Sequence, residues 1–294
     1  MPWFVLAILA AAIWGIVNIL DKYILDKLVK NPIVSFLIST PIIFMIGVLL
    51  FFIKGVDPLS PGNLILALSC GICSGLLNIF YFKAAKIEEI SRVVPIFYLA
   101  PILVAILAAI FLGEIFKPAI YLGIILLIVG TILISTRNIF KIKFNKAFGW
   151  MLISAFFFAI FAILVKYLLQ FTDYWTILTY SLLGIILVWL PVVFFYSLEL
   201  KEALRKNKMK LLSLFVGTQA LDITARGINF FAISLGFVSL VETLSSIQPF
   251  FVLIYSIILS LFWPKILKEE IGSRIILVKL LAIVLMFIGT ILIV

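Results

Sequence analysis

Ten apolar runs, each close to twenty residues long, fill most of the sequence and leave only short polar segments between them. A helix needs roughly 20 residues to cross the hydrocarbon core of a bilayer, whereas barrel strands alternate over about ten. The runs therefore predict an all-α membrane protein with ten transmembrane helices. We place these at 3–21, 33–53, 63–83, 91–112, 118–136, 147–168, 174–197, 210–235, 238–262 and 274–293.

Composition excludes a water-soluble fold and every catalytic mechanism that needs a histidine. Of the 294 residues, 65% are hydrophobic and 12% are charged, whereas soluble domains have about 45–50% and about 25%. Because the chain has no histidine, a His base, a His metal ligand and a Ser-His-Asp triad are all excluded. Cys70 and Cys73 share one apolar run without further metal ligands, so we interpret them as packing residues. We expect no enzyme, no metal site and no cofactor.

Basic residues are distributed unevenly along the chain, whose net charge is +10. The loops after odd-numbered runs hold 18 Lys and Arg, whereas the even-numbered loops hold only Lys54, Lys117 and Lys166. Loops rich in Lys and Arg stay in the cytoplasm. The sequence therefore predicts a multi-pass protein of the cytoplasmic (inner) membrane with both termini outside. The charge indicates a lipid bilayer as partner and not nucleic acid.

The two halves of the chain match each other. At an offset of 148 residues Phe82, Ala84, Ser91 and Pro101 fall on Phe230, Ala232, Ser239 and Pro249, and at an offset of 144 Lys22 and Tyr23 fall on Lys166 and Tyr167. Each half has five runs, an odd number, so the second half enters the membrane upside down. We predict two inverted five-helix repeats, at 1–138 and 147–294. Such repeats are typical of secondary transporters, which hold the substrate near the midplane.

Short motifs in the first half resemble the EamA domain of the drug/metabolite transporter superfamily. They are Ala12-Ile13-Trp14-Gly15 with Asn18 a turn later, Ser91-Arg92, Pro101, Leu112-Gly113-Glu114, and Gly130-Thr131. The second copy is more divergent, with Phe158-Ala159 in place of the Trp-Gly pair and Glu269 or Glu270 as its acidic position. The resemblance implies a ten-helix alternating-access carrier, but no particular substrate.

Polar residues inside the runs are the candidates for substrate binding, because a charged group at mid-membrane costs roughly 2.5–3.5 kcal/mol on insertion scales. The eighth run holds four of them: Gln219, Asp222, Arg226 and Asn229. Asp222 and Arg226 are spaced i, i+4, so they share a helix face and can pair. They either form the wall of a substrate cavity or make an internal ion pair that only joins helices.

Further candidates occupy corresponding places in other runs. In the third run Ser74, Asn78 and Tyr81 form a polar stripe, with helix contact through Gly71 and Gly75 as the alternative interpretation. The remaining candidates for the binding site are Trp14, Asn18, Tyr98, Glu242, Ser246 and Gln248. We interpret Glu242 as either a hydrated gate residue or a partner of Arg226.

Two prolines and two lysines occupy equivalent positions in the two halves. Pro101 and Pro249 each remove a backbone hydrogen bond in mid-run, which predicts kinks. The kinks either serve as hinges or are a packing feature common in membrane helices. Lys22 and Lys166 end equivalent first helices on opposite sides of the membrane, and we interpret both as snorkelling side chains.

The function predicted from these features is secondary active transport of a small polar or zwitterionic metabolite, with export slightly favoured. No Walker A pattern occurs, so an ion gradient would drive the transport, and Asp222 or Glu242 could load a coupled proton. If Asp222 neutralises Arg226, a zwitterion or a neutral polar solute is favoured; if the two side chains point apart, Arg226 is free to bind an anion. The alternative function is a lipid or lipid-linked-sugar flippase. We expect a monomer or dimer.

Overall fold

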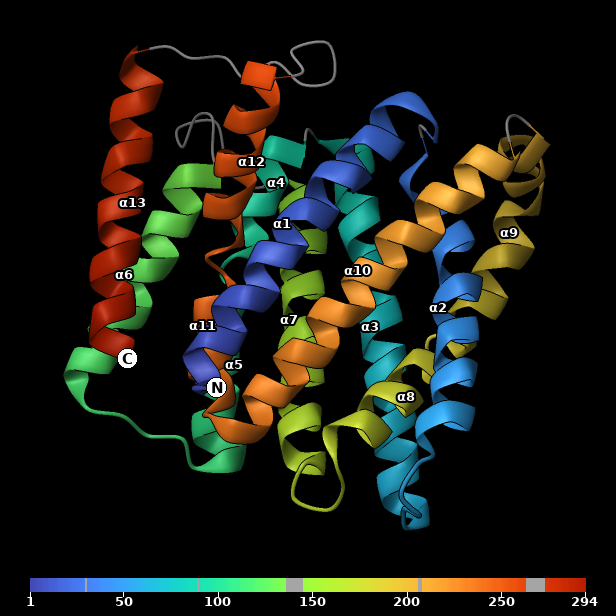
Figure 1. The fold of residues 1–294 in the computed structure, drawn as a ribbon, viewed down its shortest axis with the longest axis horizontal. Helices are drawn as coiled ribbons and strands as arrows, with labels where there is room; N and C mark the ends of the chain where they lie inside the picture. The colour runs from blue at the N-terminus through green and yellow to red at the C-terminus, as the bar shows by residue number, and fades with distance from the viewer. Residues whose placement is uncertain (30, 89, 136–144, 206–207, 263–272) are drawn as a thin grey trace.

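The computed structural model of the chain describes residues 1–29, 31–88, 90–135, 145–205, 208–262 and 273–294 (Figure 1). The elements within these ranges are all α-helices. They are α1 (Trp3–Lys27), α2 (Pro32–Lys54), α3 (Pro61–Ile87), α4 (Ile90–Phe97), α5 (Ala100–Leu112), α6 (Pro118–Ser135), α7 (Lys146–Leu168), α8 (Tyr174–Gly184), α9 (Ile186–Arg205), α10 (Lys208–Leu235), α11 (Val238–Ser245), α12 (Gln248–Phe262) and α13 (Ser273–Ile293).

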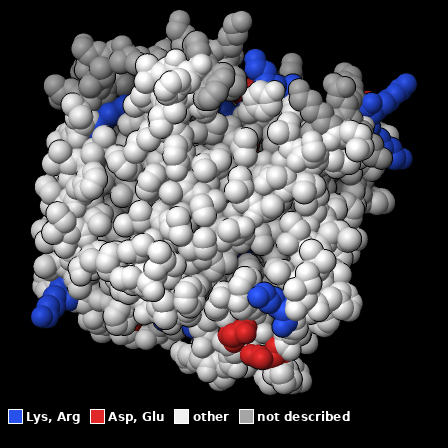
Figure 2. Space-filling view, in the orientation of Figure 1, with Lys and Arg blue, Asp and Glu red and all other residues white. Residues whose placement is uncertain are grey.

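Eight helical segments in the described part of the chain are long and apolar enough to cross a membrane. The tenth run contributes a shorter apolar helix, Val278–Ile293, and α10 with its charged pair is not among the eight. Figure 2 shows a broad uncharged band across the middle of one face, with Lys and Arg near its upper and lower rims. The prediction of an all-α membrane protein is thus confirmed for these residues, and the full count of ten spans stays a prediction.

Helix starts follow from local sequence signals. Asn31, Ser60, Asn145 and Asp173 each cap the helix that follows by accepting a hydrogen bond from a backbone N–H of its first turn. Proline follows directly after Asn31 and Ser60, at the first helical position, where its missing N–H has no intrahelical partner to lose.

Three predicted runs are each split into two helices: the fourth into α4 and α5, the seventh into α8 and α9, and the ninth into α11 and α12. The fourth and ninth break in the same way, because α4 and α11 both have 8 residues and a two-residue gap follows each. Pro101 and Pro249 are the second residues of the helices that resume. The structure thus places both prolines directly after a break in the helix.

Helices of one half pack mainly against helices of the other. The first helix of the first half, α1, packs against α10 and α12, and the first helix of the second half, α7, packs against α3 and α5. The last helices of the two halves, α6 and α13, pack against each other, side by side in Figure 1. The arrangement brings the polar residues of α1, α3 and α10 toward one another.

Glycine allows the closest of these approaches. A Cβ added at Gly71 of α3 would lie 2.4 Å from the carbonyl oxygen of Ser181, and one at Gly184 of α8 would lie 2.2 Å from that of Leu68. At Gly75 the nearest atom would be Cβ of Val188, at 2.7 Å. The glycine face of α3 therefore packs on α8 and α9, which confirms that Gly71 and Gly75 make helix contacts.

Candidate functional site

Three helices bring one polar residue each to the same depth, near the middle of their length. Trp14 is residue 12 of the 25 in α1, Ser74 is residue 14 of the 27 in α3, and Asp222 is residue 15 of the 28 in α10. Arg226 follows Asp222 one turn later. We call Trp14, Ser74, Asp222 and Arg226 the central polar cluster.

An ion pair lies at the centre of this cluster. Nη2 of Arg226 donates to Oδ2 of Asp222 at 3.0 Å, and Nη1 donates to Oγ of Ser74, also at 3.0 Å. Oδ1 of Asp222 accepts a 2.9 Å hydrogen bond from Nε1 of Trp14. The side chains of Arg226 and Asp222 are 16% and 18% exposed, respectively. The pair is thus bonded to helices of the first half and still accessible.

Contacts with α12 hold α1 in this position. Nε2 of Gln248, the first residue of α12, donates to the carbonyl oxygen of Trp14 at 3.2 Å. At Gly15 an added Cβ would lie 2.9 Å from Cβ of Phe251, so α1 and α12 are in close contact here. Gln248 begins the helix that follows the break in the ninth run, so the position of this break affects the orientation of Trp14.

The polar face of α1 continues beyond Trp14. Asn18, one turn later, is exposed, and Asp21 is half-buried and close enough to Asp222 and Tyr81 to interact electrostatically. Asp21 is not among the candidates predicted from the sequence. Its i, i+7 spacing from Trp14 places it on the same helix face, a signal obscured by its position at the very end of the predicted run.

Other predicted residues lie around the cluster but bond elsewhere. Nδ2 of Asn78 donates to the carbonyl oxygen of Ser74 in its own helix, at 2.8 Å. The ring of Tyr81 packs edge-on against Phe97 at 6.3 Å, and Tyr98 is buried at the break between α4 and α5. Gln219 is buried one turn before Asp222.

Asn229 and Glu242 form a separate group where α10 meets α11. Nδ2 of Asn229 donates to Oγ of Ser245 at 3.0 Å, and its side chain also interacts with the carboxylate of Glu242. Glu242 is 4% exposed. In this conformation Glu242 is therefore buried beside Asn229 and is not hydrated, while the printed bonds of Arg226 go to Asp222 and Ser74. Ser246 accepts through its carbonyl from Thr131 of α6, at 3.2 Å.

A second charged site, at the turn between α10 and α11, uses residues outside the predicted set. Nζ of Lys166 donates to the carbonyl oxygens of Ile233 and Gly236, at 2.9 and 2.8 Å. The buried carboxylate of Glu114 accepts from the backbone N–H of Val238 at 2.9 Å and from both the N–H (3.1 Å) and the hydroxyl of Ser239. The snorkelling interpretation of Lys166 is therefore wrong.

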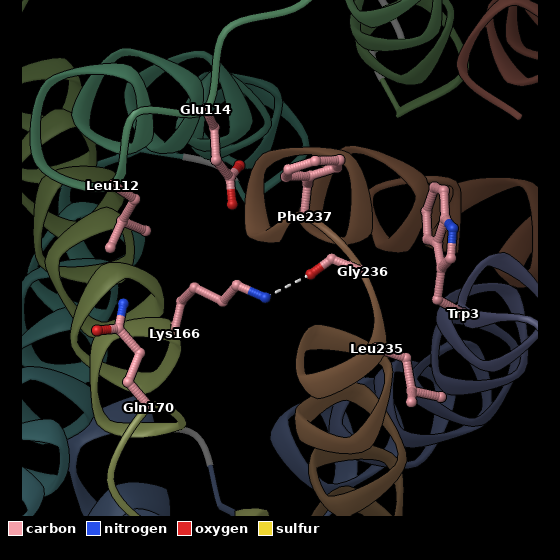
Figure 3. Close-up of a pocket in the computed structure, with 8 residues that line it drawn as sticks. All are labelled: Trp3, Leu112, Glu114, Lys166, Gln170, Leu235, Gly236 and Phe237. Carbon is pink, nitrogen blue, oxygen red and sulfur yellow. Dashed lines mark hydrogen bonds between the residues drawn. The ribbon is translucent and has the colours of Figure 1, made fainter.

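The two side chains satisfy two helix ends. Lys166 binds the carbonyls at the C-terminus of α10, and Glu114 binds the amides at the N-terminus of α11, where each charge suits the helix dipole. They border a cavity of about 300 Å³ whose lining includes Trp3, Gln170 and Phe237 (Figure 3). Trp3 at the start of α1 and Leu235 at the end of α10 both line it, and these two helix ends lie near each other in Figure 1.

Some predicted features lie outside the described residues. They are Glu269 and Glu270, Lys141 and Lys143 of the Lys- and Arg-rich loops, and the side chains of Ser91 and Arg92. In the part of the chain that is described, no three His, Cys, Asp or Glu side chains come together as a metal site.

Comparison with known proteins agrees with this architecture. Residues 1–136 match the EamA-like transporter family, which confirms the resemblance seen in the sequence. No curated protein matches the chain by sequence. Among solved structures, one described as a crystal structure of a protein has a TM-score of 0.73 at 14% sequence identity, covering 99% of this chain and 94% of that one. The latter similarity shows the fold alone.

Proposed function

We propose that this chain, which matches the EamA-like transporter family over residues 1–136, is a secondary active transporter that works by alternating access. Its substrate is a small polar metabolite that is zwitterionic or neutral overall. The observation that carries the proposal is the central polar cluster: an accessible ion pair at mid-helix whose hydrogen bonds connect α10 to α1 and α3.

The packing of the helices supports two inverted repeats, 1–138 and 147–294. The first helix of each half packs against the third and fourth helices of the other half. The fourth and ninth runs break at matching places, each followed by a proline. In transporters of this kind the substrate binds near the midplane between the repeats, which is where the cluster lies along α1, α3 and α10.

The charges of the cluster favour a zwitterion. Asp222 compensates Arg226 directly, so a bound anion would have to displace a carboxylate already held by two donors. A zwitterion can bring its own carboxylate to Arg226 and its ammonium group to Asp222 and Asp21. Binding then replaces the Arg226–Asp222 ion pair by two ion pairs between the protein and the zwitterion, so no buried charge is left uncompensated. An uncompensated buried charge is strongly unfavourable.

Orientation follows from the distribution of Lys and Arg. If both termini lie on the side of the membrane opposite the cytoplasm, the turn between α10 and α11 lies at the outer end of the bundle. Its contacts with Glu114 and Lys166 close that end. The polar residues of α1 beyond Trp14 then face the cytoplasmic side.

Asp222 or Glu242 loads the coupling proton, with export as the favoured direction.

A ligand screen by thermal unfolding tests the proposal directly. Compounds that bind the folded protein raise its apparent Tm by mass action. We expect amino-acid-like zwitterions to raise the Tm of the purified protein and to lose this effect in Arg226→Gln. Selective stabilisation by lipid-linked sugars or by a phospholipid, unaffected by Arg226→Gln, would instead support a flippase.

A further inference from the structure

We propose that Lys22 and Lys166 are equivalent latch residues that act in turn, each holding the end of the bundle that is closed. In the described conformation Lys166 and Glu114 hold the turn between α10 and α11. In the opposite conformation Lys22 binds the end of α3. This inference rests on the proposed alternating-access function.

The first observation is that the formed latch holds a junction and not a single helix. Lys166 extends from α7 to the carbonyls that end α10, and Glu114 extends from the loop after α5 to the amides that begin α11 (Figure 3). Opening this end of the bundle by moving the junction away from α5 and α7 would break both sets of hydrogen bonds. These contacts therefore stabilise the closed end specifically.

The second observation is that the components of the latch recur in the first half. Lys22 matches Lys166 at an offset of 144, and Ser91 at the start of α4 matches Ser239 at an offset of 148. The last backbone hydrogen bonds of α3 and α10 also match at the offset of 148. The N–H of Glu88 donates to the carbonyl oxygen of Ala84, and the N–H of Gly236 donates to that of Ala232. The carbonyls equivalent to those of Ile233 and Gly236 belong to Ala85 and Glu88.

The third observation is that the two equivalent lysines differ in their contacts. Lys166 is half-buried with two carbonyl partners, whereas Lys22 is exposed and makes no hydrogen bond or salt bridge to any residue the structure describes. Both α1 and α3 end at the top of Figure 1, opposite the junction of α10 and α11. One latch is thus formed and its counterpart is open, as expected for a carrier closed at one end.

The test measures which end is open, without any substrate. Spin-label pairs are placed at Phe171 and Ser234 for the latched end and at Asp26 and Ile87 for the other end, in the full chain with Cys70→Ala and Cys73→Ala, in lipid nanodiscs. We expect Lys166→Met to shift the populations about tenfold toward opening of the latched end. Lys22→Met should shift them in the opposite direction, because it removes a contact that exists only in the other conformation.

Matched controls separate the latch from general charge effects. Lys117→Met and Lys27→Met remove one exposed positive charge from the same two ends and should leave both distance distributions unchanged. Lys22→Met breaks no hydrogen bond or salt bridge among the residues that the structure describes, so its effect is measurable even if Lys166→Met folds poorly. Equal shifts in the controls, or shifts of the same sign in both latch variants, would overturn the proposal. The spin-label distances are measured without substrate. If the zwitterion screen fails, these distances therefore still test the latch.

Discussion

The indole Nε1 of Trp14 donates a 2.9 Å hydrogen bond to Oδ1 of Asp222, although 208 residues separate the two in sequence. Asp222 accepts from Arg226 through its other oxygen, so Trp14 fixes the orientation of the ion pair from the opposite half of the chain. A change in how α1 packs on α10 would therefore alter the hydrogen bonds that orient the ion pair of the proposed site. This relationship makes the site sensitive to conformation.

Arg226→Gln should reduce ligand affinity by about tenfold to a hundredfold, because a hydrogen bond to a charged group contributes about 1.5–3 kcal/mol. The measurement is the ligand-induced rise in Tm, or transport in proteoliposomes once a ligand is known. The double variant Asp222→Asn/Arg226→Gln keeps the overall charge. Full transport by a well-folded double variant would show that the pair only joins helices.

Trp14→Phe removes the indole donor and keeps an aromatic ring. We expect ligand affinity to fall by about fivefold to tenfold, in line with the net value of one hydrogen bond, about 1 kcal/mol. Trp150→Phe is the matched control, because Trp150 stacks on Phe80, 5.4 Å away, outside the cluster. Equal losses in both variants, measured by the same Tm titration, would rule out a specific role for Trp14.

Pro249→Ala should slow exchange between the two conformations several-fold with little effect on ligand affinity. Alanine supplies an N–H that proline lacks, so α11 and α12 can join into one helix across 246–247. Dwell times from single-molecule fluorescence with labels at Phe171 and Ser234 measure the exchange. A loss of affinity with unchanged dwell times would place Pro249 in the packing of the site and not at a hinge.

Orientation in the membrane is tested by cysteine labelling of intact cells. Gly62→Cys, in the exposed first turn of α3, should react with an impermeant maleimide, and Glu202→Cys, exposed near the end of α9, should not. Native Cys70 and Cys73 are buried and give little background. The reverse labelling pattern would place both termini in the cytoplasm. The closed end of the bundle would then face the cytoplasm and not the outside.

Gly184→Ala should destabilise the protein by about 1–3 kcal/mol, because the new methyl group would meet the backbone of α3 and force the helices apart. Gly149→Ala, at an exposed position in α7 with no atom within 4 Å, should be neutral or stabilising by up to about 1 kcal/mol. Chemical unfolding in detergent compares the two. Equal effects would argue against close packing of α3 on α8.

Several parts of the site were predictable because they depend on neighbours in sequence. The i, i+4 spacing of Asp222 and Arg226 predicts their pairing, and the structure places the two groups 3.0 Å apart. The glycine face of α3 was likewise separable from its polar face, since residues three and four apart share one side of a helix.

Other parts could not be predicted from local pattern. Glu114 binds amides 124 and 125 residues away, and Lys166 binds carbonyls 67 and 70 residues away. A lysine near a helix end looks the same in sequence whether it extends to lipid headgroups or to the end of another helix. The burial of Glu242 beside Asn229 was hidden for the same reason, because it depends on how α10 and α11 meet.

The sequence by itself determined the apolar helical runs, many of their ends and the spacing of charges along each face, but not where the fourth, seventh and ninth runs break. These follow from apolar length, caps and the 3.6-residue period, which act within a few turns of one helix. The tertiary structure alone decided that Trp14 and Ser74 meet the Asp222–Arg226 pair and that, among the residues that the structure describes, Lys166 binds a helix end while Lys22 does not. In a bilayer every helix is already surrounded by apolar neighbours, so hydrophobicity does not select partners. Close fits at glycine and a few polar contacts make that selection, and both depend on the complete arrangement of the helices.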